Sequence, residues 1–539
     1  MFVRASIFSL TVVLASTTLV PSAPRAAAGR IQEPFALEEV TIAALQEGLA
    51  SGQYTSRGLT ELYLRRIAEL DSSGPLLRSV IEINPDAAAV AGALDEERKA
   101  KGPRGPLHGI PIVIKDNIDT ADGMTTTAGS LALEGSIAAR DAFVVDRLRA
   151  AGAVIIAKTN LSEWANFRST KSTSGWSARG GQVKNPYALD RNPCGSSSGT
   201  GVAVAANLAA AGVGTETDGS IVCPSSANGI VGIKPTVGLV SRSGIIPISH
   251  TQDTAGPMAR TVADAAALLT GMVGEDPRDP ATRGTARRHA DYLAALDAGA
   301  LKGARIGVAR KRYFGYSPAA DRLAEEAIAV MKAQGATIVD PADIATADQL
   351  DECEFEVLLY EFKTGLNAHL GGLGPAARVH SLAEVIAFND REKEREMPYF
   401  GQEIFLMAQK KGPLTEAGYK KALTTCRSRS RALGIDAVLQ KHKLDAIVAP
   451  TGSPAWPTDL INGDHFVGAS STPAAVAGYP NITVPAGSVH GLPVGISFIA
   501  GAWSEARLIA LAYAYEQATK HRRPPAFEPT VVLPPEAGR

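Results

Sequence analysis

Short runs of β-branched residues alternate with helical segments from residue 110 onward, and this alternation most constrains the fold. Ile110–Ile114 and Ala153–Ala157 are the first two such runs, and an alanine-rich helix is expected from Gly199 to Ala211. Strands that alternate with helices and are bounded by glycine and proline are typical of an α/β core. We therefore predict an α/β fold with a large mixed central β-sheet covered by helices on both faces.

The same alternation returns in the second half of the chain. A strand at Arg305–Ala309, a helix at Ala319–Gln334 and a strand at Ala336–Val339 are expected to form a βαβ unit. Helical patterns dominate from 340 to 443. Strands are expected again at Ala446–Ala449, Asn481–Pro485 and Val494–Ile499. Since no internal repeat or long linker interrupts the chain, residues 29–539 are predicted to form a single domain.

The N-terminus has the three parts of an export signal. Arg4 precedes an apolar run over residues 5–20, and small residues follow at Ala23 and at 26–28. A membrane anchor is the alternative, but the run is short for a span and serine and threonine interrupt it. We predict a signal peptide at residues 1–28, no stable membrane anchor, and a periplasmic or secreted protein.

The charge balance of the 539 residues bears on the partner. Lysine and arginine number 54 and aspartate and glutamate 55, which gives a formal net charge of -1. Such a chain exerts no bulk attraction on nucleic acid or on an anionic membrane. We expect a small-molecule or peptide substrate, no nucleic-acid partner, and a monomer or homodimer.

Lys115 follows the apolar run Ile110–Ile114 directly. Burial at this place would disfavour the charged ammonium and make the neutral amine a usable base. The alternative is a lysine at a strand end whose ammonium reaches water along its own stem. Lys115 alone does not decide between the two interpretations.

Glycines flank three serines at Gly195–Gly199. Glycine permits unusual backbone dihedrals and the close approach of other segments, as a buried reactive turn requires. A flexible linker suits the sequence less well because an apolar segment, residues 202–208, follows directly. The run also fits G-x-S-x-G with Ser197 at its centre, the nucleophile elbow of α/β-hydrolases. That elbow follows a hydrophobic strand, and residues 187–194 do not read as one.

A third segment, Gly214–Ser220, places small and turn-forming residues ahead of a serine. Successive backbone N–H groups of a tight loop converge on one point, and an oxyanion hole is built from the main chain in this way. The alternative is an ordinary turn. Only the combination of Lys115, Ser196 and Ser220 in one stretch of chain favours catalysis, by an acyl transfer in which a serine is activated by a base.

These three pieces, followed by the segment Gly229–Thr236, resemble the amidase signature family. The resemblance is dense from about Gly105 to Arg260 and extends weakly to Ala449–Thr451. It implies the amidase signature fold and a hydrolase that acts on linear amide C–N bonds. It implies no metal and no organic cofactor.

The resemblance also implies a role for each of the singled-out residues. Ser220 would be the nucleophile that forms an acyl-enzyme, and Ser196, after a cis peptide bond from Gly195, the relay. Lys115 would be the base. The oxyanion would be held by the N–H groups around Thr217, Asp218 and Gly219.

The substrate is constrained by two further segments. Lys158–Phe167 matches a segment that lies beside the acyl-binding channel in family members, so Trp164, Asn166 and Phe167 are candidate pocket residues. Core packing is the alternative for the two aromatic side chains.

The segments Gly214–Pro224 and Gly238–Arg242 are similar to bacterial peptide amidases, which remove the C-terminal amide nitrogen of peptides. Asp218 and Val222 stand where many members have glycine and arginine, and this disfavours a small carboxylate-bearing substrate. We predict deamidation of peptide C-terminal amides or amino-acid amides with release of ammonia. The alternatives are an aryl-acylamidase, a fatty-acid amide hydrolase and a glutamine-hydrolysing amidotransferase subunit.

The four cysteines are Cys194, Cys223, Cys353 and Cys426, and they lack the C-x-x-C spacing of a zinc or dithiol site. Three full pairings are open to them. Cys194 and Cys223 each lie within three residues of a candidate serine, so a disulfide that braces the site and a pair of buried free thiols are both compatible with the sequence.

Overall fold

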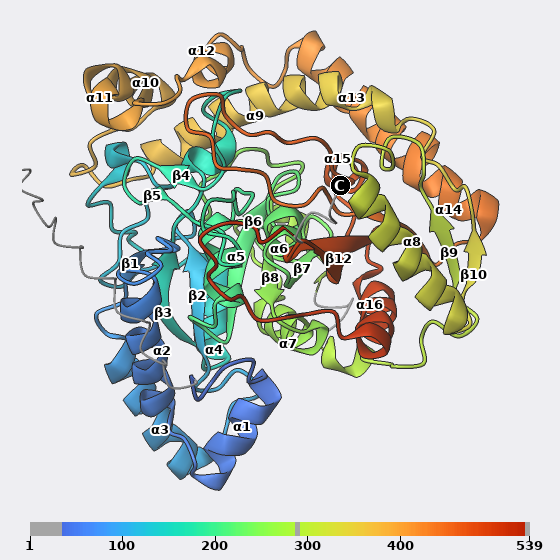
Figure 1. The fold of residues 1–539 in the computed structure, drawn as a ribbon. Coiled ribbons are helices and arrows are strands. Elements are labelled where there is room, and N and C mark those ends of the chain that lie inside the picture. Colours follow the sequence, from blue (N-terminus) through green and yellow to red (C-terminus); the bar gives the residue numbers. More distant parts are fainter. Residues whose placement is uncertain (1–34, 286–290, 534–539) are drawn as a thin grey trace, which may run out of the picture. The chain divides into compact units, whose positions relative to one another are not determined.

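The computed structural model describes residues 35–285 and 291–533, and the predicted signal peptide at residues 1–28 lies outside them. The chain separates into Met1–Glu38 and Glu39–Arg539. The second unit contains the sheet and every helix and strand discussed below (Figure 1). No helix in the described residues is both long and apolar enough to span a bilayer.

An 11-stranded mixed sheet runs through this unit in the order β1-β3-β2-β6-β8-β7-β12-β13-β11-β9-β10. β2 is parallel to β3 and β6, and β9 is parallel to β10 and β11, whereas the remaining pairs are antiparallel. The strands are β1 (Val80–Ile83), β2 (Pro111–Lys115), β3 (Val154–Thr159), β6 (Ala211–Glu216), β7 (Val231–Lys234), β8 (Thr254–Ala259), β9 (Arg305–Val308), β10 (Thr337–Val339), β11 (Ala446–Pro450), β12 (Asn481–Val489) and β13 (Leu492–Ile499). A separate pair, β4 (Trp176–Ser177) and β5 (Gly181–Gln182), is antiparallel.

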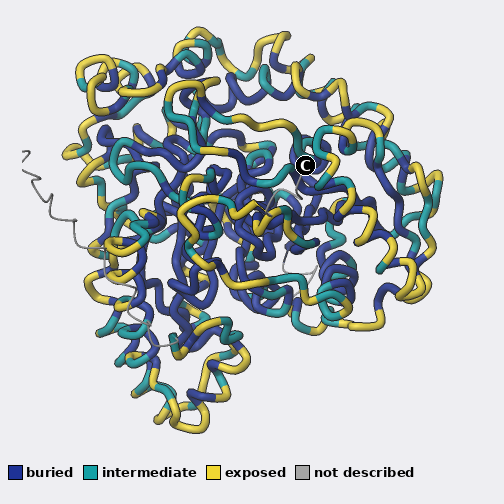
Figure 2. The backbone as a smooth tube through the Cα atoms, viewed as in Figure 1, coloured by how far each residue is buried: buried dark blue, intermediate teal, exposed yellow. Residues whose placement is uncertain are grey.

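Helices surround the sheet, as predicted, and together with it they bury the central strands (Figure 2). The first helices are α1 (Ile42–Ser51), α2 (Ser56–Leu70), α3 (Ala87–Lys101), α4 (Phe143–Ala150), α5 (Ser198–Ala205), α6 (Val222–Ala227), α7 (Val262–Met272) and α8 (Pro318–Ala333). The others are α9 (Asp351–Gly371), α10 (Leu382–Arg391), α11 (Lys393–Glu396), α12 (Glu403–Gln409), α13 (Ala417–Ser430), α14 (Asp436–His442), α15 (Thr472–Ala477) and α16 (Glu505–Thr519).

The helix expected from Gly199 to Ala211 is shorter in the structure. α5 ends at Ala205, residues 206–210 form turns in which Asn207 adopts a left-handed backbone (φ 57°), and β6 begins at Ala211 between β2 and β8. Small residues let β6 pack closely against α5. A Cβ added to Gly212 would lie 2.6 Å from Thr200 Cγ2 of α5, so glycine lets the helix lie close to the strand.

The charged stretch from Asp390 to Glu396 is a helical surface except at its last residue. Glu396 is fully buried and accepts hydrogen bonds from Ser130 Oγ (2.9 Å) and from the Leu131 N–H (2.6 Å). A charge run is usually solvated, and here one carboxylate is buried with two donors on Oε1 and the buried guanidinium of Arg168 3.7 Å from Oε2.

Candidate active site

Lys115, the last residue of β2, is fully buried and surrounded by oxygen atoms. Its Nζ lies 2.8 Å from Ser196 Oγ, 2.9 Å from Thr215 Oγ1 and 3.4 Å from the Thr215 carbonyl oxygen. Burial lowers the pKa of Lys115 to about 7, against the opposing effect of the negative charges of Asp253 and Glu216. A large fraction of Lys115 is therefore the neutral amine near pH 7, with Ser196 in hydrogen-bond contact.

Ser196 and Ser197 precede α5 and are both fully buried. The Gly195–Ser196 peptide bond is cis. Ser197 Oγ donates to the Thr215 carbonyl (3.0 Å) and accepts from the Thr215 N–H (3.2 Å). Its backbone N–H donates to the Ser220 carbonyl (3.1 Å). Ser197, the middle serine of the run, thus joins the segment of Ser196 to those of Thr215 and Ser220.

Ser220 lies in the turn that connects β6 to α6. Gly219 has a left-handed backbone (φ 77°), a conformation that glycine adopts without a Cβ penalty. The Glu216 carboxylate accepts from the N–H groups of Ile221 (2.8 Å) and Val222 (3.1 Å) and so closes the turn from beneath. Burial raises the pKa of Glu216, and the charge of Lys234 and these two N–H groups lower it.

Four backbone N–H groups at this turn have no acceptor within the part of the chain that the structure describes. They belong to Thr217, Asp218, Gly219 and Ser220. The side chains of two of these residues are occupied elsewhere, because Thr217 Oγ1 donates to Asp253 (2.6 Å) and Asp218 accepts from Thr472 Oγ1 (2.7 Å). Unpaired main-chain donors beside a serine can bind an oxyanion.

Ser220 opens onto a cleft of about 740 Å³, in the usual range for a ligand pocket. Ser220 is 8% exposed, whereas Lys115 and Ser196 behind it are fully buried. Asn166 and Phe167 line this cleft. Trp164 does not line it, because its ring packs edge-on against Phe405 (5.7 Å) within an apolar cluster. Trp164 therefore packs in the core, which was the alternative role considered for the two aromatic residues.

Of the three possible pairings of the four cysteines, the structure contains one, with two disulfide bonds. Cys194 is bonded to Cys223 and Cys353 to Cys426. The first bond links the residue before Gly195 to α6, directly after the Ser220 turn, and both of its cysteines line the cleft. The disulfide alternative, rather than free thiols, therefore holds at the site.

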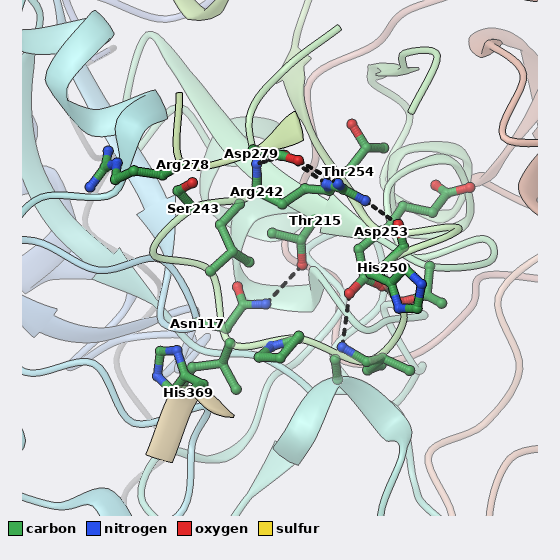
Figure 3. Close-up of a pocket in the computed structure, with 17 residues that line it drawn as sticks. Asn117, Thr215, Arg242, Ser243, His250, Asp253, Thr254, Arg278, Asp279 and His369 are labelled. Atoms are coloured by element: carbon green, nitrogen blue, oxygen red, sulfur yellow. Dashed lines mark hydrogen bonds and ion pairs between the residues drawn. The ribbon is translucent and has the colours of Figure 1, made fainter. Parts of the chain in front are cut away.

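A second cavity, of about 240 Å³, lies behind the Thr215–Thr217 segment (Figure 3). The Asn117 side chain lines it and donates from Nδ2 to Thr215 Oγ1 (3.0 Å), the atom that also contacts Lys115. Thr215 and Asn117 were not recognised in the sequence. Asn117 stands two residues after Lys115, but nothing local indicates that its side chain turns toward β6.

The sequence matches a model of the amidase family over residues 58–509. The chain therefore belongs to the amidase family, and it is an amide-hydrolysing enzyme.

Among solved structures, native peptide amidase from Stenotrophomonas maltophilia is 52% identical, with a TM-score of 0.88 over 92% of this chain and 100% of that one. A probable amidase of Arabidopsis thaliana is 44% identical over 95% of this chain and 96% of its own length. One of the subunits of the glutamyl-tRNA(Gln) amidotransferase of Pseudomonas aeruginosa is 36% identical over 91% of this chain and 99% of its own length.

Proposed function

We propose that the enzyme cleaves amides through a Ser-cisSer-Lys triad in which Ser220 is the nucleophile, Ser196 the relay and Lys115 the base. The observation that carries this proposal is the contact between a fully buried lysine, with its pKa lowered to about 7, and a buried serine hydroxyl 2.8 Å away. A neutral amine in such a contact can accept the hydroxyl proton, and a protonated one cannot.

The steps follow from this arrangement. Neutral Lys115 takes the proton of Ser196, Ser196 takes that of Ser220, and the Ser220 oxygen bonds to the amide carbonyl carbon. The free N–H groups at residues 217–219 bind the negative oxygen. The proton then returns through Ser196 to the amide nitrogen, the C–N bond breaks and ammonia leaves. Water cleaves the acyl-enzyme by the same relay and regenerates Ser220.

Ser220→Ala tests the nucleophile. We expect amide hydrolysis to fall by about 10⁴-fold or more, because no oxygen remains to form the acyl-enzyme. Ser197→Ala is the matched control, since Ser197 is the central serine of the G-x-S-x-G run. A larger loss in Ser197→Ala than in Ser220→Ala would contradict the assignment.

We propose peptide C-terminal amides and amino-acid amides as the substrates. Support comes from the 52% identity to a peptide amidase and from a cleft large enough for a peptide end. The departures at Asp218 and Val222 from the glycine and arginine of many members argue against a small carboxylate-bearing substrate.

A substrate panel tests this class. Ammonia release by the purified chain alone is measured with peptide amides, amino-acid amides, glutamine and fatty-acid amides, and arylamine release with anilides. Peptide amides should have the highest kcat/KM. A preference for anilides or fatty-acid amides would overturn the peptide assignment, and glutamine turnover that requires ATP and partner subunits would support the amidotransferase role.

We further propose export, on the N-terminal sequence alone. N-terminal sequencing of the protein recovered from the periplasm or medium should begin near residue 29. Recovery of the full-length chain from the cytoplasm would contradict it.

A further inference from the structure

The loop at residues 457–471 forms one side of the catalytic cleft. Phe466 and Val467 line the cleft together with Ser220, and they are 50% and 41% exposed. Large apolar side chains that stay half exposed leave stabilisation by burial unused, about 25 cal/mol for each Å². Two adjacent ones inside a cleft that also holds a serine nucleophile indicate a surface that a ligand covers.

Hydrogen bonds within the protein hold this loop in place. The Asp464 carboxylate accepts hydrogen bonds from the Ser174 N–H (3.0 Å), from Asn192 Nδ2 (3.0 Å) and from Trp456 Nε1 (3.2 Å). Three donors from three segments fix the loop at the residue two positions before Phe466. A surface that is ordered in advance binds without the entropic cost of ordering.

The Phe466 ring is also positioned relative to the catalytic serines. It packs edge-on against Trp456, with ring centroids 5.7 Å apart. Trp456 is itself buried in a cluster with Cys194 and Cys223. Since these cysteines flank the segments of Ser196 and Ser220, a short chain of contacts sets the position of Phe466 relative to the nucleophile.

The rest of the cleft favours an uncharged group beside this loop. The apolar side chains of Phe167, Ile248 and Leu358 also line it. Of the four ionic side chains that line the cleft, Asp464 accepts from its three donors, Asp218 accepts from Thr472 Oγ1, and Arg312 pairs with both carboxylate oxygens of Asp351 (2.7 and 2.9 Å), whereas Lys171 is exposed to solvent. A charged substrate side chain would lose its hydration beside Phe466 with little compensation.

We propose that Phe466 and Val467 form a preformed apolar wall that binds an apolar side chain on the acyl part of the substrate. The proposal rests on the proposed function in placing that substrate at Ser220. It makes Phe466 a specificity-determining residue, which favours peptide amides with leucine or phenylalanine over those with glycine.

The test compares Phe466→Ala with the wild-type enzyme on dipeptide amides in which leucine, phenylalanine or glycine occupies either position. We expect kcat/KM for the leucine and phenylalanine amides to fall about tenfold, with the glycine amides almost unchanged. Ile461→Ala is the matched control, because Ile461 is 79% exposed in the same loop and does not line the cleft. It should leave every rate unchanged.

Measuring substrate binding to the Ser220→Ala variant tests this proposal independently of amide hydrolysis. Dissociation constants of the same amides are measured by calorimetry on Ser220→Ala with and without Phe466→Ala. A selective tenfold loss for the apolar amides supports the wall. Equal losses for all amides, no loss, or the same loss in Ile461→Ala would overturn it. Absence of turnover in the wild-type enzyme would overturn the proposed function and leave this binding result to stand by itself.

Discussion

Lys115 and Lys158 lie on neighbouring parallel strands, both fully buried, yet their surroundings differ in kind. Lys158 pairs with Ile114 in the register of β2 and β3, so side chains of Lys115 and Lys158 leave the sheet on opposite faces. Lys115 contacts Ser196 and Thr215. Lys158 donates to the Ile118 carbonyl (2.5 Å) and to Thr126 Oγ1 (2.9 Å).

The charges around the two lysines complete the comparison. Burial lowers the pKa of both, and the carboxylates of Asp116, Asp119, Asp122 and Glu82 oppose that effect at Lys158. Lys158 in turn lowers the pKa values of Asp116 and Asp119, which burial raises. Burial alone therefore does not make a lysine a base. Both lysines contact a hydroxyl, but the partner of Lys115 is Ser196 in the segment beside Ser220, whereas Lys158 contacts Thr126 and lies among four carboxylates.

Among these substitutions, Lys115→Met should have the largest effect, a loss of activity. We expect kcat/KM for a peptide amide to fall by at least about 10³-fold, since no other amine in the described part of the chain contacts Ser196. The same variant should be more stable at pH 7, because it no longer buries an amine whose charged form burial disfavours. Thermal unfolding and ammonia release measure the two effects, and a drop of less than tenfold in rate would assign the base elsewhere.

The stability effect of Lys115→Met has a pH dependence. With its pKa at about 7 in the folded protein and about 10.4 when unfolded, Lys115 binds more protons in the unfolded chain between these values. Its destabilising effect is thus full below pH 7 and disappears above about pH 10. The gain in Tm for the variant should shrink over that range.

Lys158→Met should have the opposite effect. It removes the buried ammonium beside Asp116 and Asp119 and leaves Asp116 only its ion pair with Arg179 (3.8 Å), so we expect a loss of up to about 3 kcal/mol, the lower end of the range for breaking a buried pair. Thermal and denaturant unfolding should show this loss, while the folded fraction keeps a kcat/KM within a few-fold of wild type. A stable but inactive Lys158→Met would show that the two faces of the sheet are not separate.

The pH profile of the wild-type enzyme sharpens the assignment of the base. The proposed mechanism requires neutral Lys115, so kcat/KM should rise tenfold per pH unit below 7 and level off above it. At pH 5 about 1% of the plateau should remain. Burial raises the pKa of Asp253 to about 6, and its negative charge raises the pKa of Lys115, so the loss of that charge below pH 6 lowers the pKa of Lys115 further and makes the acid limb shallower there. A profile that rises through pH 9 would mean an ordinary lysine.

The threonine partners give the smallest expected effects. Thr215→Val removes a contact of Lys115, and Thr126→Val removes the equivalent contact of Lys158. We expect Thr215→Val to lower kcat about tenfold and Thr126→Val to lower stability by about 1 kcal/mol. Kinetics and denaturant unfolding of both variants test this. Equal changes in kcat and in stability for the two variants would contradict the different roles of the two lysines.

The strand and helix patterns of the sequence predicted the mixed α/β fold because they are local signals, and the resemblance to the amidase signature family implied that Lys115 and Ser196 lie together. The sequence did not indicate the positions of three further side chains, those of Thr215, Asn117 and Phe466. Phe466 is far from Ser220 along the chain, and only the path of the loop at 457–471 brings it to the cleft. β6 was missed because its glycines look like loop residues, while tertiary packing makes them a strand.

The glycines of β6 make the enzyme sensitive to substitutions at positions that contact no substrate. A Cβ on Gly212 would meet α5, and one on Gly214 would lie 2.8 Å from Ser197 Oγ. The glycines thus set the distance of β6 from the segment of Ser196 and Ser197, and β6 carries Thr215, which contacts Lys115. Alanine at either glycine should lower activity by shifting the groups of the proposed proton relay, although neither glycine lines the cleft.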